Sequence, residues 1–234
     1  MSVGNDALQA ILTSRGAVMT KRGGMSVPAH FGSAAGELSA CVRGVGIANR
    51  CDLGKLVVAG AERSIRALAR HHVSVELAPG GVAATREGWW CADRADRLLV
   101  LVAAEARARL HATLMQDVRG RDMTVFDASQ KLASLAIAGR GMHHLLALLR
   151  IVPPMGNLRS VAPYSAVDLG GLRVNLLLES DHRALLITDV AHADEVWQAA
   201  ETVGRPLGLS LVGIDALERF AVFETMQLRR TVAP

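Results

Sequence analysis

Residues 27–55, VPAHFGSAAGELSACVRGVGIANRCDLGK, carry the clearest local pattern in this sequence. Pro28 and Gly32 mark a turn, and Ser33 then stands where a helix N-cap would, because its hydroxyl can accept from unpaired N–H groups of the first turn. The apolar residues that follow recur at the spacing of one helix face: Leu38, Cys41, Val42 and Val45. Since glycines come next, the pattern predicts a short amphipathic helix followed by a strand over 53–58.

Helix and strand patterns alternate along the rest of the chain. A polar, glycine-rich turn is expected at 20–24 and a loop over 155–165, after a Pro-Pro pair that ends a helix. Helices are expected over 5–12, 61–72, 103–116, 142–149, 194–207 and 215–224. Strands are expected over 55–60, 73–77, 88–91, 98–102, 123–128, 132–138, 167–169, 172–178, 184–189 and 209–212. This order, with several hairpins, predicts an α+β fold with mainly antiparallel sheets.

The stretch 27–55 resembles the start of the folate-binding domain of the glycine-cleavage T-protein (aminomethyltransferase) family. Its matching residues are His30, Phe31, Gly32, Ser33, Glu37, Ala40, Gly46, Gly54 and Lys55. Two later segments resemble the same domain in the same order, VFDASQKLASLAIAGRGMHHLLALL at 125–149 and GLSLVGIDALERFAVFE at 208–224. The resemblance implies mainly antiparallel sheets, with ferredoxin-like subunits around a central cavity. By this resemblance, the chain is expected to correspond to the family's folate-binding domain without the C-terminal barrel domain, like the small folate-type subunit of sarcosine oxidase.

The resemblance also implies a domain organisation. An N-terminal helix and turn are expected over 1–26, and a T-protein-like folate-binding domain over 27–234. The latter is either one unit or two intimately packed subdomains, about 27–122 and 123–234.

Several residues of the family's binding site are replaced in this chain. Asn49 stands in place of an Asp, Leu53 of a Met and Leu185 of a Glu, and the segment that carries the family's principal carboxylate is missing. Ile214 replaces an Arg, although the Asp after it is kept as Asp215. What remains implies cofactor contacts to tetrahydrofolate from Leu53, Trp90, Leu185 and Asp215.

Asp52 and His182 are the candidate catalytic residues. Folate-dependent one-carbon transfer needs an acid–base group beside N5 and N10 of tetrahydrofolate. Asp52 follows the lost Asp closely, and His182 falls in the turn that matches the family's pterin-facing one, where an imidazole would take over acid–base duty. Each has a plainer interpretation: Asp52 as a surface carboxylate at a strand entrance, His182 as an exposed loop histidine, and Asp215 as the cap of its own helix.

Composition excludes other classes of protein. The net charge is +4, but the arginines are dispersed and only one Tyr and four Phe are available for base stacking, which argues against nucleic-acid binding. No apolar run reaches the about 18–20 residues that cross a bilayer, and no signal-peptide pattern is evident. Three cysteines without metal-ligand spacing indicate a cytoplasmic protein with reduced thiols. The pairs His71-His72 and His143-His144 consist of helix neighbours that point about 100° apart, so no metal site is expected.

Three functions are consistent with these observations. The first is a tetrahydrofolate-binding one-carbon (aminomethyl or methyl) transferase, which the preserved opening stretch favours. The second is a T-protein scaffold repurposed as a folate-independent biosynthetic enzyme for a small molecule, by cyclisation or rearrangement. The third is a non-catalytic subunit of an oxidase or demethylase complex. The expected partners are accordingly a small-molecule substrate and a partner subunit or second copy of the chain.

Overall fold

The computed structural model describes residues 3–152 and 161–232. The Pro-Pro pair and much of the loop expected over 155–165 lie outside the described residues. The helices are α1 (Val3–Ser14), α2 (Ala34–Arg43), α3 (Glu62–Val73), α4 (Arg107–Asp117), α5 (Met142–Leu148), α6 (Ala193–Gly204) and α7 (Ile214–Val232), with short 3-10 helices η2 (Val190–His192) and η3 (Arg205–Leu207). Among the described residues, no helix is long and apolar enough to cross a membrane.

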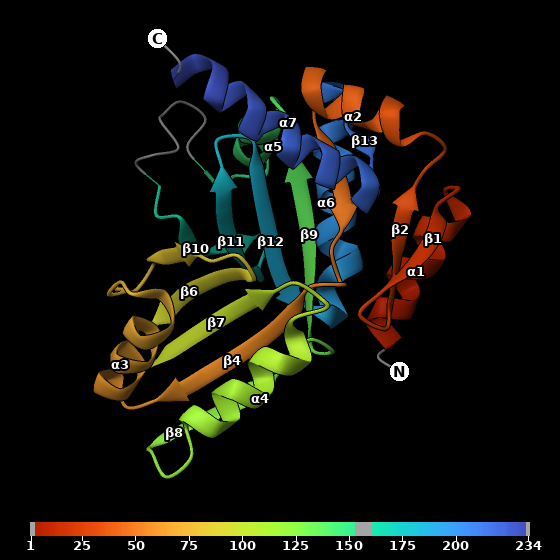
Figure 1. Cartoon of the computed structure of the whole chain (residues 1–234). Helices are drawn as coiled ribbons and strands as arrows, with labels where there is room; N and C mark the ends of the chain where they lie inside the picture. The colour runs from red at the N-terminus through yellow and green to blue at the C-terminus, as the bar shows by residue number, and fades with distance from the viewer. Residues whose placement is uncertain (1–2, 153–160, 233–234) are drawn as a thin grey trace.

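The strands form two sheets and a separate hairpin (Figure 1). They are β1 (Val18–Arg22), β2 (Met25–His30), β3 (Gly46–Asn49), β4 (Gly54–Gly60), β5 (Val82–Ala84), β6 (Gly88–Arg94), β7 (Arg97–Val102), β8 (Met123–Asp127), β9 (Leu132–Ala138), β10 (Tyr164–Leu169), β11 (Leu172–Ser180), β12 (Arg183–Asp189) and β13 (Ser210–Leu211). A six-stranded sheet has the order β10-β11-β12-β9-β3-β13, a five-stranded sheet the order β5-β6-β7-β4-β8, and β1 pairs with β2. The pairings are antiparallel except for β13 with β3, which confirms the predicted fold class.

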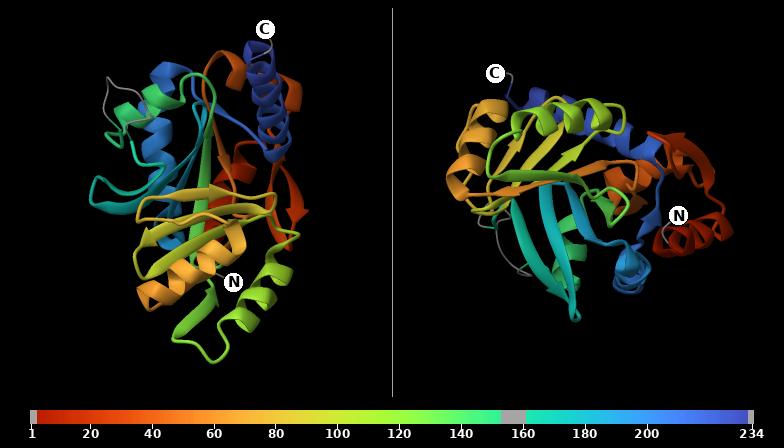
Figure 2. Two further views of the ribbon diagram at one scale, coloured as in Figure 1. Left: turned by 60° about the vertical axis from the view of Figure 1, so that its left-hand side comes forward. Right: turned by 90° about the horizontal axis from the view of Figure 1, so that it is seen from below.

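The two sheets face each other across a central apolar cluster (Figure 2). Strand alternation produces it, because every second side chain of each sheet points to the shared side. Its members include Val57, Leu99 and Leu101 of the five-stranded sheet, Ala136, Leu177 and Leu185 of the six-stranded sheet, and Leu217 and Phe220 of α7. The outer face of the six-stranded sheet packs against α1, α5 and α6, and that of the five-stranded sheet against α3 and α4.

The stretch 27–55 folds as its pattern predicts and joins distant parts of the chain. Ser33 is the N-cap of α2, and its Oγ accepts from the N–H of Gly36 at 3.2 Å. The C-cap residue Gly44 donates its N–H to the carbonyl of Ala40 at 2.7 Å, which ends the helix. At Gly46, a Cβ would lie 2.8 Å from a side-chain atom of Val212, so only glycine lets β3 approach β13 this closely.

Some expected elements are corrected by the structure. Residues 73–77 were expected to form a strand, but Val73 ends α3, and Ser74 takes a left-handed conformation with φ of 58° that breaks the chain away. Four strands lie where none is expected: β1, β2, β5 and the fully buried β3. Each sheet contains a strand from the other half of the chain. The strand β3 of the first half lies in the six-stranded sheet, and β8 of the second half lies in the five-stranded sheet.

Candidate functional site

A concavity lined by both polar and apolar side chains lies beneath α7. This α7 groove consists of two cavities where α7 crosses the inner face of the six-stranded sheet. The larger, of about 270 Å³, is lined by Val42, Arg140, Ser180, Asp181, His182, Phe220, Phe223, Glu224 and Gln227. The smaller, of about 100 Å³, is lined by Arg50, Ala136, Ile137, Ala138, Glu179, Arg183, Leu217, Glu218 and Ala221.

Arg183 connects the two cavities through its carboxylate partners. Its Nε donates to Oε2 of Glu224 at 2.5 Å, and its Nη1 donates to Oε2 of Glu179 at 3.3 Å. The hydroxyl of Ser180 donates to the other oxygen of Glu224 at 2.8 Å. Both carboxylate side chains are largely buried, with 10% and 12% of their surface exposed, so the guanidinium compensates charges that have little contact with water.

Arg50, which lines the smaller cavity, forms an ion pair with the candidate catalytic residue Asp52. Its Nε and Nη2 donate to the two carboxylate oxygens of Asp52 at 2.9 and 3.1 Å. Burial opposes the charge of Arg50, but the carboxylate of Asp52 outweighs it and raises the pKa of the guanidinium. Because both oxygens of Asp52 are taken up by this fork, the carboxylate serves the ion pair and is poorly placed to accept a proton from a ligand.

Lys55 is fully buried beside this ion pair. Its Nζ donates to the carbonyl of Cys51 at 3.3 Å, and burial lowers the pKa of its ammonium to about 8. A lysine with so low a pKa is a nucleophile candidate in an open site. Lys55 lines neither cavity of the α7 groove, so it has no approach for a substrate there.

The structure separates the residues that the sequence suggested for cofactor binding. Leu185 is fully buried in the central apolar cluster, and Leu53 packs against the same cluster. Trp90 lies on the opposite face of the five-stranded sheet, 3% exposed, in the core beneath α3 and α4. Asp215 lies half-buried in the first turn of α7. One ligand cannot contact both Leu185 and Trp90, because a sheet lies between their side chains.

His182 is the candidate that lines the α7 groove. It lies in the turn between β11 and β12 and lines the larger cavity of the α7 groove, as an exposed side chain. Its N–H donates to the Oγ of Ser180 at 3.2 Å, which shapes the turn. Its catalytic role remains a prediction.

Sequence reasoning missed most of the charged residues of the groove. Glu179 and Arg183 lie four positions apart across one hairpin, a spacing that places them side by side when β11 and β12 pair. Glu224 comes from α7, and no local pattern links it to that hairpin. In this ion-pair cluster of Glu179, Arg183 and Glu224, the pair on the hairpin could therefore have been predicted from the sequence. The contact with Glu224 of α7 depends on the tertiary structure.

Comparison with known proteins supports the fold. No protein-family model and no sequence of a curated protein matches this chain. Its structure is similar to the glycine cleavage system aminomethyltransferase T from Bartonella henselae, with a TM-score of 0.71, 13% identity, and coverage of 89% of this chain and 59% of that one. This chain thus spans little more than half the length of that enzyme.

A second similar structure is a chain of the heterotetrameric sarcosine oxidase from Corynebacterium sp. U-96. The TM-score is 0.59 at 16% identity, and the match covers 74% of this chain and 92% of that one. At such identities the likeness shows the fold alone. The resemblance read from the sequence is confirmed at that level: this chain has the fold of an aminomethyltransferase-like domain.

Proposed function

We propose that this chain is a non-catalytic, aminomethyltransferase-like subunit of a multi-subunit oxidase or demethylase, and that it binds a partner chain in place of folate. The observation that carries the proposal is the burial of Leu185. The sequence resemblance sets this residue against the family's pterin-facing Glu, yet its side chain has no exposed surface and packs in the central apolar cluster.

A pterin ring at this position would meet hydrocarbon where it needs polar partners. Its ring nitrogens and amino group require hydrogen bonds, and each buried group left without one costs about 1–3 kcal/mol. Aliphatic side chains such as Leu101 and Leu177 are buried in the same cluster, and the hydroxyl of Tyr164 is a buried polar group there without a hydrogen-bond partner among the described residues. Ile214, which replaces an Arg, is buried as well. The binding of tetrahydrofolate between the sheets is therefore unfavourable.

Two observations favour a partner chain. The outer face of α7 exposes Val222 and Met226, one helical turn apart, with 54% and 59% of their surface accessible. Apolar side chains grouped on an exposed face are typical of a protein-binding surface. The structural match to a chain of a heterotetramer extends over 92% of that chain, so an assembly subunit can consist of little more than this fold.

Affinity purification of the tagged full-length chain from the cells that encode it tests the proposal. We expect a co-purifying oxidase or demethylase subunit that, once produced separately, re-forms a stoichiometric complex with the chain in sedimentation velocity. Recovery of catalytic one-carbon transfer to tetrahydrofolate by the chain alone would overturn the proposal.

A second candidate function is the binding of a folate or another aromatic anion in the α7 groove. Phe220 and Phe223 lie in its larger cavity with ring centroids 6.3 Å apart and planes inclined by 26°. Arg140 and Glu224 line the same cavity, so it offers an aromatic surface, a cation and a carboxylate. This arrangement favours a transferase or a repurposed biosynthetic enzyme. Titration of wild-type and Phe223→Ala protein with 5-formyltetrahydrofolate tests it, since groove binding would weaken in the variant.

A further inference from the structure

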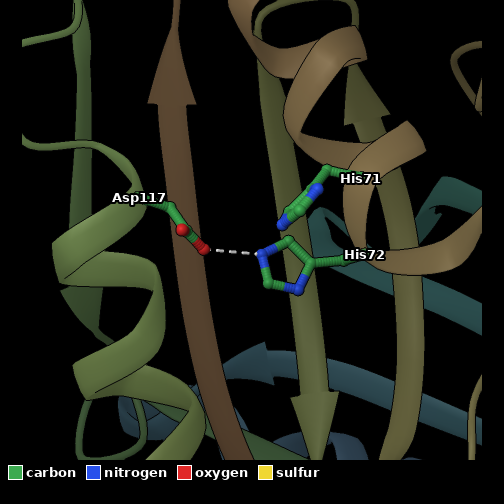
Figure 3. Close-up of side chains that lie close together, drawn as sticks. All are labelled: His71, His72 and Asp117. Atoms are coloured by element: carbon green, nitrogen blue, oxygen red, sulfur yellow. Dashed lines mark hydrogen bonds and ion pairs between the residues drawn. The ribbon is translucent and has the colours of Figure 1, made fainter.

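Three potential metal ligands converge on the far side of the five-stranded sheet from the α7 groove. His71 and His72 belong to the last turn of α3, and Asp117 is the last residue of α4 (Figure 3). The Nε2 of His72 lies 2.8 Å from Oδ2 of Asp117, and one ligand atom from each of the three residues lies within 4.8 Å of the others. We propose that His71, His72 and Asp117 form a binding site for a divalent transition-metal ion, with Zn²⁺ as the best fit.

The donor set suits this class of ion. Two imidazole nitrogens and one carboxylate oxygen are ligands that Zn²⁺, Co²⁺ and Ni²⁺ prefer over Mg²⁺ or Ca²⁺. Metal–ligand bonds of about 2.0–2.2 Å in a tetrahedral arrangement place neighbouring donor atoms about 3.3 Å apart. His72 and Asp117 are already somewhat closer than that, and the exposed His71 has only to rotate toward them.

The position of His72 is fixed by its neighbour in the core. Its ring stacks on Trp90 with centroids 4.8 Å apart and planes inclined by 22°. Because Trp90 is itself 3% exposed and packed beneath α3, it holds the imidazole plane in one orientation. A ligand whose rotamer is fixed before binding loses less conformational entropy when the metal arrives.

The backbone around the site favours a cation. Both α3 and α4 end here, and unpaired carbonyls give a helix C-terminus a partial negative charge. With three protein ligands, a tetrahedral ion keeps one position for water or another small ligand. His72 and Trp90 also help to line a cavity of about 280 Å³.

The role of His71 separates a metal site from a simple hydrogen bond. The contact of His72 with Asp117 alone would pair a histidine with a carboxylate and would need no third group. His71 contributes nothing to that pair, although its ring lies edge-on to His72 with centroids 5.1 Å apart. A metal site would use it as a third ligand.

Titration of the chelator-treated full-length chain with Co²⁺ and then Zn²⁺ tests the proposal. We expect one equivalent of Co²⁺ to give the visible d–d absorption of a tetrahedral complex and to quench part of the fluorescence of the three tryptophans, that of Trp90 above all, and Zn²⁺ to displace the Co²⁺. His71→Ala and Asp117→Asn should each weaken the affinity at least about tenfold. His144→Ala, which removes an exposed histidine of the other neighbouring pair, should leave it unchanged.

Two results would overturn the proposal. One is the absence of saturable one-to-one binding by the wild-type chain. The other is an unchanged affinity in His71→Ala, which would reduce the cluster to a His72–Asp117 hydrogen bond. Because His71 is exposed, its substitution leaves the core intact, and circular dichroism of each variant verifies the fold.

Discussion

The carboxylate of Glu37 accepts a hydrogen bond from the backbone N–H of Gly213 at 2.8 Å, across 176 positions of sequence. Its other oxygen accepts from the N–H of Phe31 at 2.6 Å. At Gly213, a Cβ would lie 2.0 Å from the carbonyl oxygen of Ala29, so no other residue fits there. A single buried side chain thus ties α2 to the start of α7, and with it the wall of the α7 groove.

Substitution of Glu37 should destabilise the fold. In Glu37→Gln the amide nitrogen would face one of the two N–H donors, which leaves a buried donor without an acceptor. We expect the free energy of unfolding to fall by about 2 kcal/mol, as for hydrogen bonds to charged groups. Urea denaturation measures it, with the exposed Glu62→Gln as control. A loss no larger than that of the control would contradict this role.

Replacement of Lys55 should stabilise the chain, and by an amount that depends on pH. Burial lowers the pKa of the folded-state ammonium from 10.5 to about 8. Below pH 8 both states carry the proton and the penalty is complete. Between pH 8 and 10.5 only the unfolded state binds the proton, so the free energy of unfolding of the wild-type chain rises with pH. Lys55→Met should therefore stabilise by on the order of 3 kcal/mol near pH 7, less the lost hydrogen bond to Cys51, and progressively less toward pH 10.

The comparison of Lys55→Met with wild type at each pH cancels the titration of Cys41 but not that of Cys51, because the charge of Lys55 lowers the pKa of the Cys51 thiol. Burial raises the pKa of Cys51 to about 11 and that of Cys41 to about 12, so both oppose folding as the pH rises above 9. Thermal or urea unfolding at pH 7, 8, 9 and 10 measures the difference, with the exposed Lys131→Met as control. A pH-independent difference would show that Lys55 keeps its ordinary pKa.

The ion-pair cluster of the α7 groove should show strong energetic coupling. Arg183→Leu leaves Glu179 and Glu224 buried without their cation, which costs about 3 kcal/mol. Adding Glu224→Leu removes one of those charges. The free energy of unfolding lost in the double variant should therefore be smaller than the sum of the losses in the two single variants, by at least about 1 kcal/mol. A double-mutant cycle by urea denaturation measures this coupling. Simple additivity would mean that the groove is open to water.

The exposed face of α7 should matter for assembly but not for folding. Val222→Glu with Met226→Glu changes side chains that are more than half exposed, so the free energy of unfolding should stay within about 0.5 kcal/mol of wild type. Two carboxylates there should abolish binding of the partner chain in sedimentation velocity. Val75→Glu, at an exposed apolar residue next to α3, is the matched control. Undiminished complex formation by the double variant would place the interface elsewhere.

Local signals explain how much of the fold was predictable. The cap at Ser33 and the stop at Gly44 are read within a few residues, and α2 follows them. The strand β3 has no such signal, because all four of its residues are buried and its partners β9 and β13 lie far along the chain. Strand alternation puts the neighbours Trp89 and Trp90 on opposite faces of β6, but it does not indicate which sheet face belongs to which core.

The candidate sites were predictable to a smaller extent for the same reason. The neighbouring His71 and His72 do not by themselves make a metal site, and the structure adds Asp117 from a helix that ends 45 residues later. The fork of Arg50 on Asp52 spans only two positions, yet whether such a pair is exposed or buried depends on the whole fold. Patterns predict elements and their faces; they do not predict which distant side chains meet.

Calorimetric titration of the full-length chain with tetrahydrofolate and 5-formyltetrahydrofolate tests most directly whether an aminomethyltransferase-like fold has here lost its cofactor. With Leu185 and its neighbours filling the space between the sheets, we predict no saturable heat of binding up to millimolar ligand. A dissociation constant in the micromolar range would contradict the account. Its loss in Phe223→Ala would place the ligand in the α7 groove, and its loss in a variant of the central apolar cluster would place it between the sheets.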